Sequence, residues 1–105
     1  MTLEDLKLAC EAEGFNYAYG LFKTPPTPPY IITDTDSSEM FHADDVVYFR
    51  KNMINLNYVY KDKNQADIDK IENKILKDVS WQKSDESYNP SENVWQITYY
   101  FEIGG

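Results

Sequence analysis

His42 and Cys10 are the residues whose types most often do acid–base or nucleophilic chemistry, and each is the single residue of its kind in the chain. One histidine cannot supply the three protein ligands of a catalytic zinc site without carboxylates, and the sequence does not place any beside it. No serine or cysteine nucleophile can be paired with His42 from spacing. Cys10 falls on the apolar stripe of an expected helix, which favours a small core residue. We therefore expect no catalytic residue, no metal ligand and no cofactor, in a protein that is not an enzyme.

Five of the acidic residues fall within residues 34–45, and no lysine or arginine lies among them. The "DTDSSE" run at 34–39 has alternating oxygen ligands like those of a calcium loop, but it lacks the glycine and the bidentate glutamate at the required offsets. The adjacent pair at 44–45 could couple as carboxylates, although neighbouring side chains usually point apart. We predict a solvated acidic segment formed by Asp34, Asp36, Glu39, Asp44 and Asp45.

The whole chain is acidic, with a formal net charge of −8 and a pI near 4.4. Residues 1–49 carry nine acids against two bases, whereas residues 50–105 carry nine against eight. This balance argues against binding of nucleic-acid phosphates or anionic lipid. A single cysteine excludes an intramolecular disulfide framework, and we see no signal peptide and no apolar run near the ~20 residues of a membrane helix. We expect a soluble protein made in a reducing cytosol.

Four prolines stand within five positions, at Pro25, Pro26, Pro28 and Pro29. They satisfy the P-x-x-P pattern that SH3-type domains bind as an extended helix, but the nearest base is Lys23. The favoured interpretation is structural. Prolines stiffen the crossing between two strands at little entropic cost and remove backbone donors at a sheet edge. We assign these four residues to a putative assembly interface.

Hydrophobic periodicity divides the chain into two helices and six strands in a single domain, 1–105. Helices are expected over 2–14, capped by Thr2 and Asp5, and over 64–79, capped by Asn64. Arg50, Lys51 and Asn52 suit a tight hairpin. A polar turn is expected at 85–93, and strands over 15–22, 30–33, 46–50, 53–61, 80–84 and 94–103.

The resulting order is α-β-β-β-β-α-β-β, which predicts an α+β fold with a mainly antiparallel sheet and two helices packed on one face. Most tyrosines alternate with polar positions and are expected in the core with their hydroxyls near its rim. Tyr48 and Tyr100 lie off the best-defined core faces, so we add them to the assembly interface. The other face of the sheet, with Asn55 and Asn57, is expected either to meet water or to meet another subunit.

With this order assembled, the sequence resembles small siphophage and prophage proteins of Gram-positive bacteria, often labelled minor capsid or tail completion proteins. The resemblance is carried by "YAYGLFKTPPTPPYII", by the acidic "FHADDVVY", and by "INLNYVYKDKNQADIDKIENKIL" leading to "VWQITYYFEI". It covers nearly the entire chain, and its motifs are patterned rather than catalytic.

The resemblance implies a tail terminator or head–tail joining protein in the virion neck or tail, made in the host cytoplasm. Such proteins form a ring, commonly of six copies, on the tail tube, and the implied partners are other copies, the tail tube protein and head connector proteins. The acidic segment could then line the lumen or a rim and repel passing DNA. The alternative is an acidic DNA mimic that inhibits a host nucleic-acid-binding enzyme. A weaker alternative is a proline-ligand adaptor.

Overall fold

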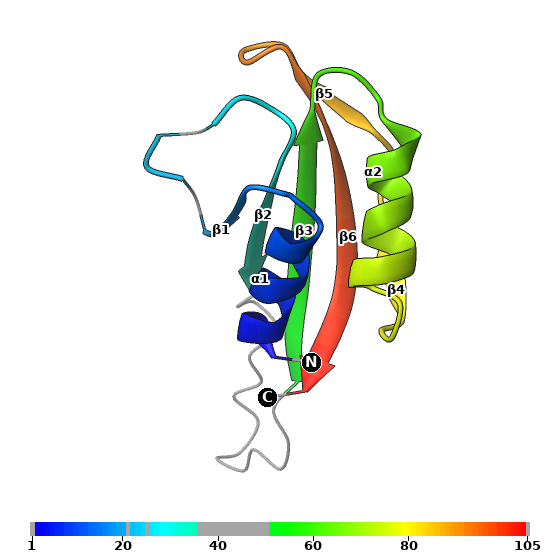
Figure 1. Cartoon of the computed structure of the whole chain (residues 1–105). Helices are drawn as coiled ribbons and strands as arrows, with labels where there is room; N and C mark the ends of the chain where they lie inside the picture. The colour runs from blue at the N-terminus through cyan, green and yellow to red at the C-terminus, as the bar shows by residue number, and fades with distance from the viewer. Residues whose placement is uncertain (1, 21, 25, 36–50, 105) are drawn as a thin grey trace, which may run out of the picture.

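The computed structural model describes residues 2–20, 22–24, 26–35 and 51–104 and shows an α+β fold (Figure 1). Six strands form one mixed sheet, accompanied by two helices, so the α+β prediction is confirmed. The helices are α1 (Leu3–Ala12) and α2 (Gln65–Lys70), which continues into a π-helical turn, η2 (Ile71–Ile75). The strands are β1 (Tyr17–Tyr19), β2 (Tyr30–Thr35), β3 (Lys51–Tyr60), β4 (Trp81–Lys83), β5 (Ser87–Asn89) and β6 (Val94–Gly104).

The sheet is built around the long pair β3 and β6, in the order β1-β2-β3-β6-β4, with β5 also paired to β6. Strand β1 pairs with β2 in parallel, whereas the other pairs are antiparallel. We expected consecutive strands to be hairpin partners, and for β1 and β2 this is wrong. The ten-residue segment 20–29 returns the chain to the end of the sheet where β1 began, which a tight hairpin cannot do.

Two further expectations differ from the structure. Lys51 and Asn52 belong to β3 and pair with Gly104 and Ile103, so the predicted hairpin turn at these residues is wrong. Strand β5 lies inside the predicted polar turn at 85–93, where Ser87 to Asn89 pair with Gln96 to Val94. Asn93 closes the β5–β6 connection at a φ of 55°, which asparagine tolerates better than most residues. The expected strand 46–50 lies outside the described residues.

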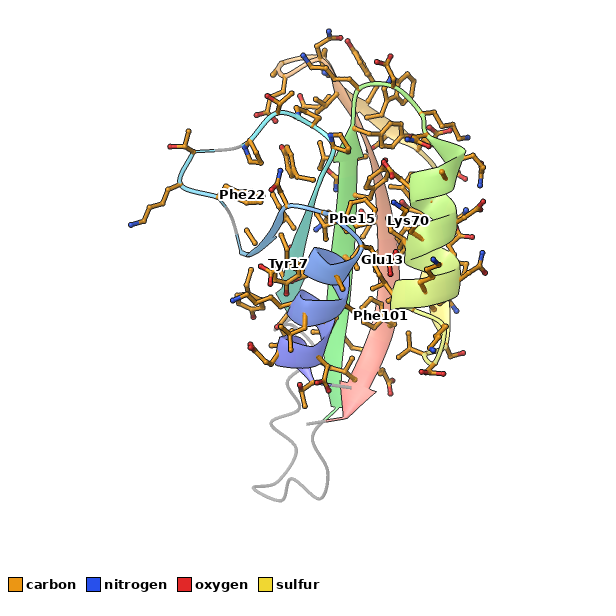
Figure 2. The ribbon with its side chains drawn as sticks, in the orientation of Figure 1. Glu13, Phe15, Tyr17, Phe22, Lys70 and Phe101 are labelled. Carbon is orange, nitrogen blue, oxygen red and sulfur yellow. The ribbon has the colours of Figure 1, made fainter. Side chains whose placement is uncertain are left out.

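The core lies on one face of the sheet, which we call the core face. The predicted alternation in β3 is confirmed, because Ile54, Leu56, Tyr58 and Tyr60 are all buried. They form one cluster with inward residues of β6 and with residues of both helices, including Leu6, Cys10, Ile71 and Ile75. Figure 2 shows Phe15 and Phe101, two members of this cluster, among the side chains that fill the space between strands and helices.

Both helices begin as the sequence predicts. Thr2 Oγ1 accepts a hydrogen bond from the Asp5 amide at 3.1 Å, and Asp5 Oδ2 accepts one from the Thr2 amide at 3.0 Å. Asn64 Oδ1 accepts from the Ala66 amide at 3.0 Å. Each cap satisfies backbone donors that the first helical turn leaves without partners. In the described part of the chain, no helix is long and apolar enough to cross a membrane.

Candidate functional site

The sheet face opposite the core carries a connected ladder of polar side chains, which we call the polar face. Its members come from the three central strands and are Asp34 (β2), Asn55 and Asn57 (β3), and Gln96, Thr98 and Tyr100 (β6). They share this face because side chains alternate along a strand, and the core residues take the positions between them. The core of the protein therefore determines which residues form this surface.

Asn57 is the centre of the ladder. Its Oδ1 accepts from Gln96 Nε2 at 2.9 Å and from Thr98 Oγ1 at 2.8 Å. Its Nδ2 donates to the Ile32 carbonyl at 3.2 Å and to Asp34 Oδ2 at 3.4 Å. Asn55 Nδ2 donates to the other oxygen of Asp34 at 2.9 Å. These contacts fix the amide groups in place and hold the Asp34 carboxylate within the sheet surface.

Two residues predicted for different sites meet in one row of this face. Asp34 pairs with Asn55, and Asn55 pairs with Tyr100 on the next strand. Tyr100 is 41% exposed, as expected for an interface residue, and Asp34 is half-buried. Asp34 is thus part of a strand and is hydrogen-bonded, whereas the sequence suggested an unneutralised loop. The other acids of that group (Asp36, Glu39, Asp44 and Asp45) lie outside the described residues, as do His42 and Tyr48.

The prolines lie at the far end of the same face. A small apolar cluster of Tyr30, Val59 and Val94 is covered there by Phe22, whose ring meets Tyr30 edge-on at 5.3 Å. Beside it lies a hollow of about 180 Å³, lined by Pro26, Pro28, Tyr30, Lys61, Glu92 and Val94. Pro29 is exposed, and Pro25 lies outside the described residues.

The structure does not bring the prolines and Tyr100 together. Val94 and Tyr100 are six residues apart on β6, which corresponds to about 20 Å along a strand. The predicted assembly interface is therefore two separate patches at opposite ends of the polar face. We find one hollow next to the prolines and one flat polar surface around Tyr100.

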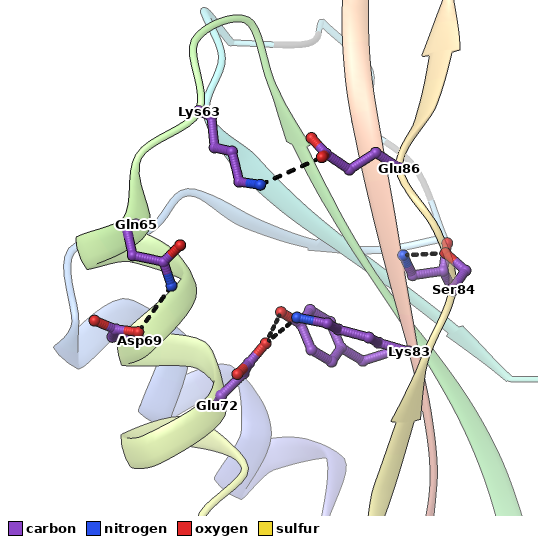
Figure 3. Close-up of polar contacts among 9 residues, drawn as sticks. Lys63, Gln65, Asp69, Glu72, Lys83, Ser84 and Glu86 are labelled. Atoms are coloured by element: carbon purple, nitrogen blue, oxygen red, sulfur yellow. Dashed lines mark hydrogen bonds and ion pairs between the residues drawn. The ribbon is translucent and has the colours of Figure 1, made fainter.

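Under α2, three buried tyrosines donate hydrogen bonds to carboxylates, a feature that the sequence analysis missed. Tyr58 donates to Asp67 at 2.9 Å, Tyr99 donates to Glu72 at 2.8 Å, and Tyr60 donates to Glu86. The Leu76 amide bonds to the Ile71 carbonyl at 2.9 Å, five residues back, so Glu72 lies in the π-helical turn. Figure 3 shows Glu72 facing Lys83, whose ammonium donates at 2.7 Å to the same carboxylate oxygen that accepts from Tyr99.

These contacts change the ionisation of the groups involved. Burial, followed by the hydrogen bond to a carboxylate, raises the pKa of Tyr58, Tyr60 and Tyr99 well above the ordinary phenol value. The hydrogen bond from Tyr60 lowers the pKa of Glu86. Burial raises the pKa of the Cys10 thiol to about 12, with a smaller contribution from the Glu11 carboxylate. Cys10 is therefore protonated at neutral pH, in line with its predicted place in the core.

The sequence analysis also missed an exposed aromatic pair at the β5 edge. The rings of Tyr88 and Trp95 lie 5.0 Å apart, and their side chains are 46% and 40% exposed. Trp95 lies in step with the core residues of β6, but β5 covers only part of its side chain. The sequence did contain a signal for this pair. Two short segments, "SYN" and "VWQ", are separated by four turn residues, which is the pattern of a hairpin.

Comparison with known proteins adds no family to this description. No protein-family model matches the chain, and no curated protein matches it either. Among the described residues, no group of three or more histidine, cysteine, aspartate or glutamate side chains is placed to hold a metal ion.

Proposed function

We propose that this chain is a non-enzymatic structural protein of a phage or prophage, a tail terminator or head–tail joining subunit that assembles as a ring on the tail tube. The observation that carries the proposal is the polar face, an ordered surface of hydrogen-bonded amides and hydroxyls on the side of the sheet away from the core. The resemblance of the sequence to neck and tail proteins supports the same assignment.

A subunit of a ring needs surfaces that hold their shape before the neighbour arrives, because ordering side chains on contact reduces affinity. The ladder from Asp34 through Asn57 to Thr98 meets this need, since its amides and hydroxyl are already held by hydrogen bonds. Protein interfaces are depleted of charge at their centre and enriched in tyrosine. Tyr100, which is 41% exposed on this face, is a residue of the type enriched in interfaces.

The mainly antiparallel sheet with its helices on one face also suits this function, because it leaves the opposite face for contacts. A ring requires two different patches on each copy, so that one patch meets the other around a closed circle. The polar face around Tyr100 and the proline hollow are two distinct surfaces through which such a subunit could also contact neighbouring proteins. The resemblance implies that the acidic segment predicted from the sequence faces the lumen or a rim of the ring, where like charge would repel the DNA backbone.

The decisive experiment is electron microscopy of particles made by a phage or prophage that carries this gene, with and without a deletion of it. We expect the deletion to give tails of abnormal length or tails that do not join heads, and the wild-type copy to restore them. Native mass spectrometry of the protein, alone and with the tail tube protein, should show a closed ring in at least one of these states.

Two single substitutions test whether the polar face is the surface required for joining. Tyr100→Arg puts a charge at the centre of the polar face and should abolish joining, whereas Leu8→Arg on the exposed side of α1 serves as the matched control. Normal particles after the deletion would refute the proposal. So would a stable monomer that binds a host nuclease in a salt-sensitive manner, which is the behaviour of a DNA mimic.

A further inference from the structure

One lateral edge of the sheet is β1, and the other is formed by β4 and β5, which pair with successive parts of β6. Strand β4 carries Lys83, whereas β1 (Tyr-Ala-Tyr) and β5 (Ser-Tyr-Asn) contain no charged residue and no proline. Proteins usually protect edge strands with lysine, proline, bulges or a covering element, because the unpaired backbone groups of an edge strand can form hydrogen bonds with a strand of another chain. In a chain of net charge −8, β1 and β5 are two uncharged edge strands with which another strand could pair.

The backbone of β1 offers hydrogen-bonding groups on its outer side. The Ile31 amide donates to the Asn16 carbonyl, and the Gly20 amide donates to the Thr33 carbonyl. Because backbone groups alternate in direction along a strand, the amides and carbonyls of Tyr17 and Tyr19 point away from β2. Within the described residues, no strand pairs with that side.

Strand directions make the two edges complementary. Strand β1 is parallel to β2, and β2 and β6 are both antiparallel to β3, so β1 and β6 run the same way. Strand β5 is antiparallel to β6. If a second copy stands beside the first in the same orientation, its β1 runs antiparallel to β5 of the first, which is the more stable kind of strand pair.

The exposed aromatic side chains match the same arrangement. Tyr88 and Trp95 pair across β5 and β6 and lie on the core face, in step with Ile97 and Tyr99. Tyr19 pairs with Thr33, which is also on the core face, and is 54% exposed. When β1 of one copy meets β5 of another, the three aromatic residues come together on one side of the joined sheet and bury each other.

We propose that copies of this chain join edge to edge, β1 of one against β5 of the next, so that one sheet continues from subunit to subunit. This inference rests on the proposed ring and names the contact that builds it. Tyr17 and Tyr19 lie level with Ile97 and Tyr99 on β6, whereas Tyr88 lies opposite Trp95. Pairing either tyrosine of β1 with Tyr88 keeps the core faces on one side and staggers adjacent copies by about two or four residues, about 7 or 13 Å along the strands. Sheets that close on themselves require such a stagger and a tilt of the strands.

The test uses two variants that each block one edge with a charge, Tyr19→Lys and Tyr88→Lys. Leu8→Lys is the control, because Leu8 is as exposed as Tyr19 but lies on α1. We expect analytical ultracentrifugation at high protein concentration to show the oligomer for the wild type and for Leu8→Lys, and monomers for each edge variant. A mixture of the two edge variants should give dimers and nothing larger, since each retains the edge that the other has lost. Dimers in the mixture also show that both variants are folded.

Cross-linking identifies the strands in contact. With a short bis-maleimide linker, a mixture of Tyr19→Cys and Tyr88→Cys should give dimers, and neither variant should do so alone; buried Cys10 does not react in the folded chain. Dimers of a single variant, or linkage of Tyr19→Cys to Gln82→Cys on β4, would overturn the proposal. If both lysine variants keep the wild-type oligomer, this contact is refuted and the proposed ring is not. If the wild type does not oligomerise and the mixture of Tyr19→Cys and Tyr88→Cys does not cross-link, this contact is also refuted, while the micrographs decide the proposed function separately.

Discussion

Alkaline pH should unfold this protein well before it affects most proteins of its size, because four buried groups must stay protonated in the folded state. Cys10, Tyr58, Tyr60 and Tyr99 are each at most 1% exposed, and each has a raised pKa. In the unfolded chain the thiol ionises near its ordinary value of 9.0 and the phenols near 10.0. The unfolded state therefore releases protons first, and the free energy of unfolding falls as the pH rises.

The size of the effect follows from these values. The stability that comes from Cys10 is complete below pH 9.0 and is lost as the pH approaches its folded-state pKa of about 12. At about pH 11 this group alone lowers the free energy of unfolding by roughly 3 kcal/mol. Each of the three phenols that stays protonated in the folded state lowers the free energy of unfolding by about 1.4 kcal/mol more at that pH. The total loss is therefore roughly 7 kcal/mol. The whole free energy of unfolding of a domain of this size is about 5–15 kcal/mol, so a loss of this size is enough to unfold it.

Urea unfolding followed by circular dichroism, repeated from neutral pH to about pH 11, measures this loss. The absorbance of tyrosinate should rise together with unfolding, because the phenols ionise when they are released. The matched control is Cys10→Ala, which should flatten the slope between pH 9.0 and pH 10.0 while the phenol-driven loss above pH 10.0 persists. If wild-type stability is unchanged up to about pH 11, or if Cys10→Ala has the same slope as the wild type, the reasoning is refuted.

Three further substitutions test the contacts described above, each by its effect on the free energy of unfolding at neutral pH. Thr2→Ala removes the capping box of α1 and should cost about 1 kcal/mol, whereas Lys7→Ala on the exposed side of α1 should change little. Tyr99→Phe leaves the partly buried Glu72 carboxylate without its phenol donor and should cost about 1.5–3 kcal/mol; an unchanged midpoint would exclude that hydrogen bond. Asn57→Ala leaves Gln96, Thr98 and Asp34 without their shared partner and should cost about 1–3 kcal/mol, with no loss expected if the ladder does not form.

The sequence predicts well those parts of the fold in which one local pattern is repeated. The alternation in β3 and β6 and the caps at Thr2 and Asn64 are confirmed, because each depends on residues only a few positions apart. The partners of the strands were predicted less well. Whether β1 joins β2 in parallel depends on where a ten-residue crossing returns, and no local pattern specifies that.

The candidate site likewise contains features that follow from a local sequence pattern and features that depend on the pairing of distant segments. Tyr100 was selected correctly as an exposed residue because its position is out of step with the core. The contact of Asp34 with Asn55 and Asn57 could not be predicted, since it depends on the register between β2 and β3. The tyrosine–carboxylate bonds were missed because they depend on how α2, the π-helical turn and the β4–β5 connection pack against the sheet.

The hydrogen bonds of the polar face explain how it can be covered by a neighbour at little cost. Burying a polar group without a partner costs about 1–3 kcal/mol, so an open amide surface resists desolvation. Here the amides of Asn55 and Asn57 already have acceptors, and the carboxylate of Asp34 already has donors. A second protein that covers this face would therefore exclude water without leaving these groups unpaired, and the exposed ring of Tyr100 would supply apolar contact area. The ladder that stabilises the sheet is therefore compatible with the assembly that we propose.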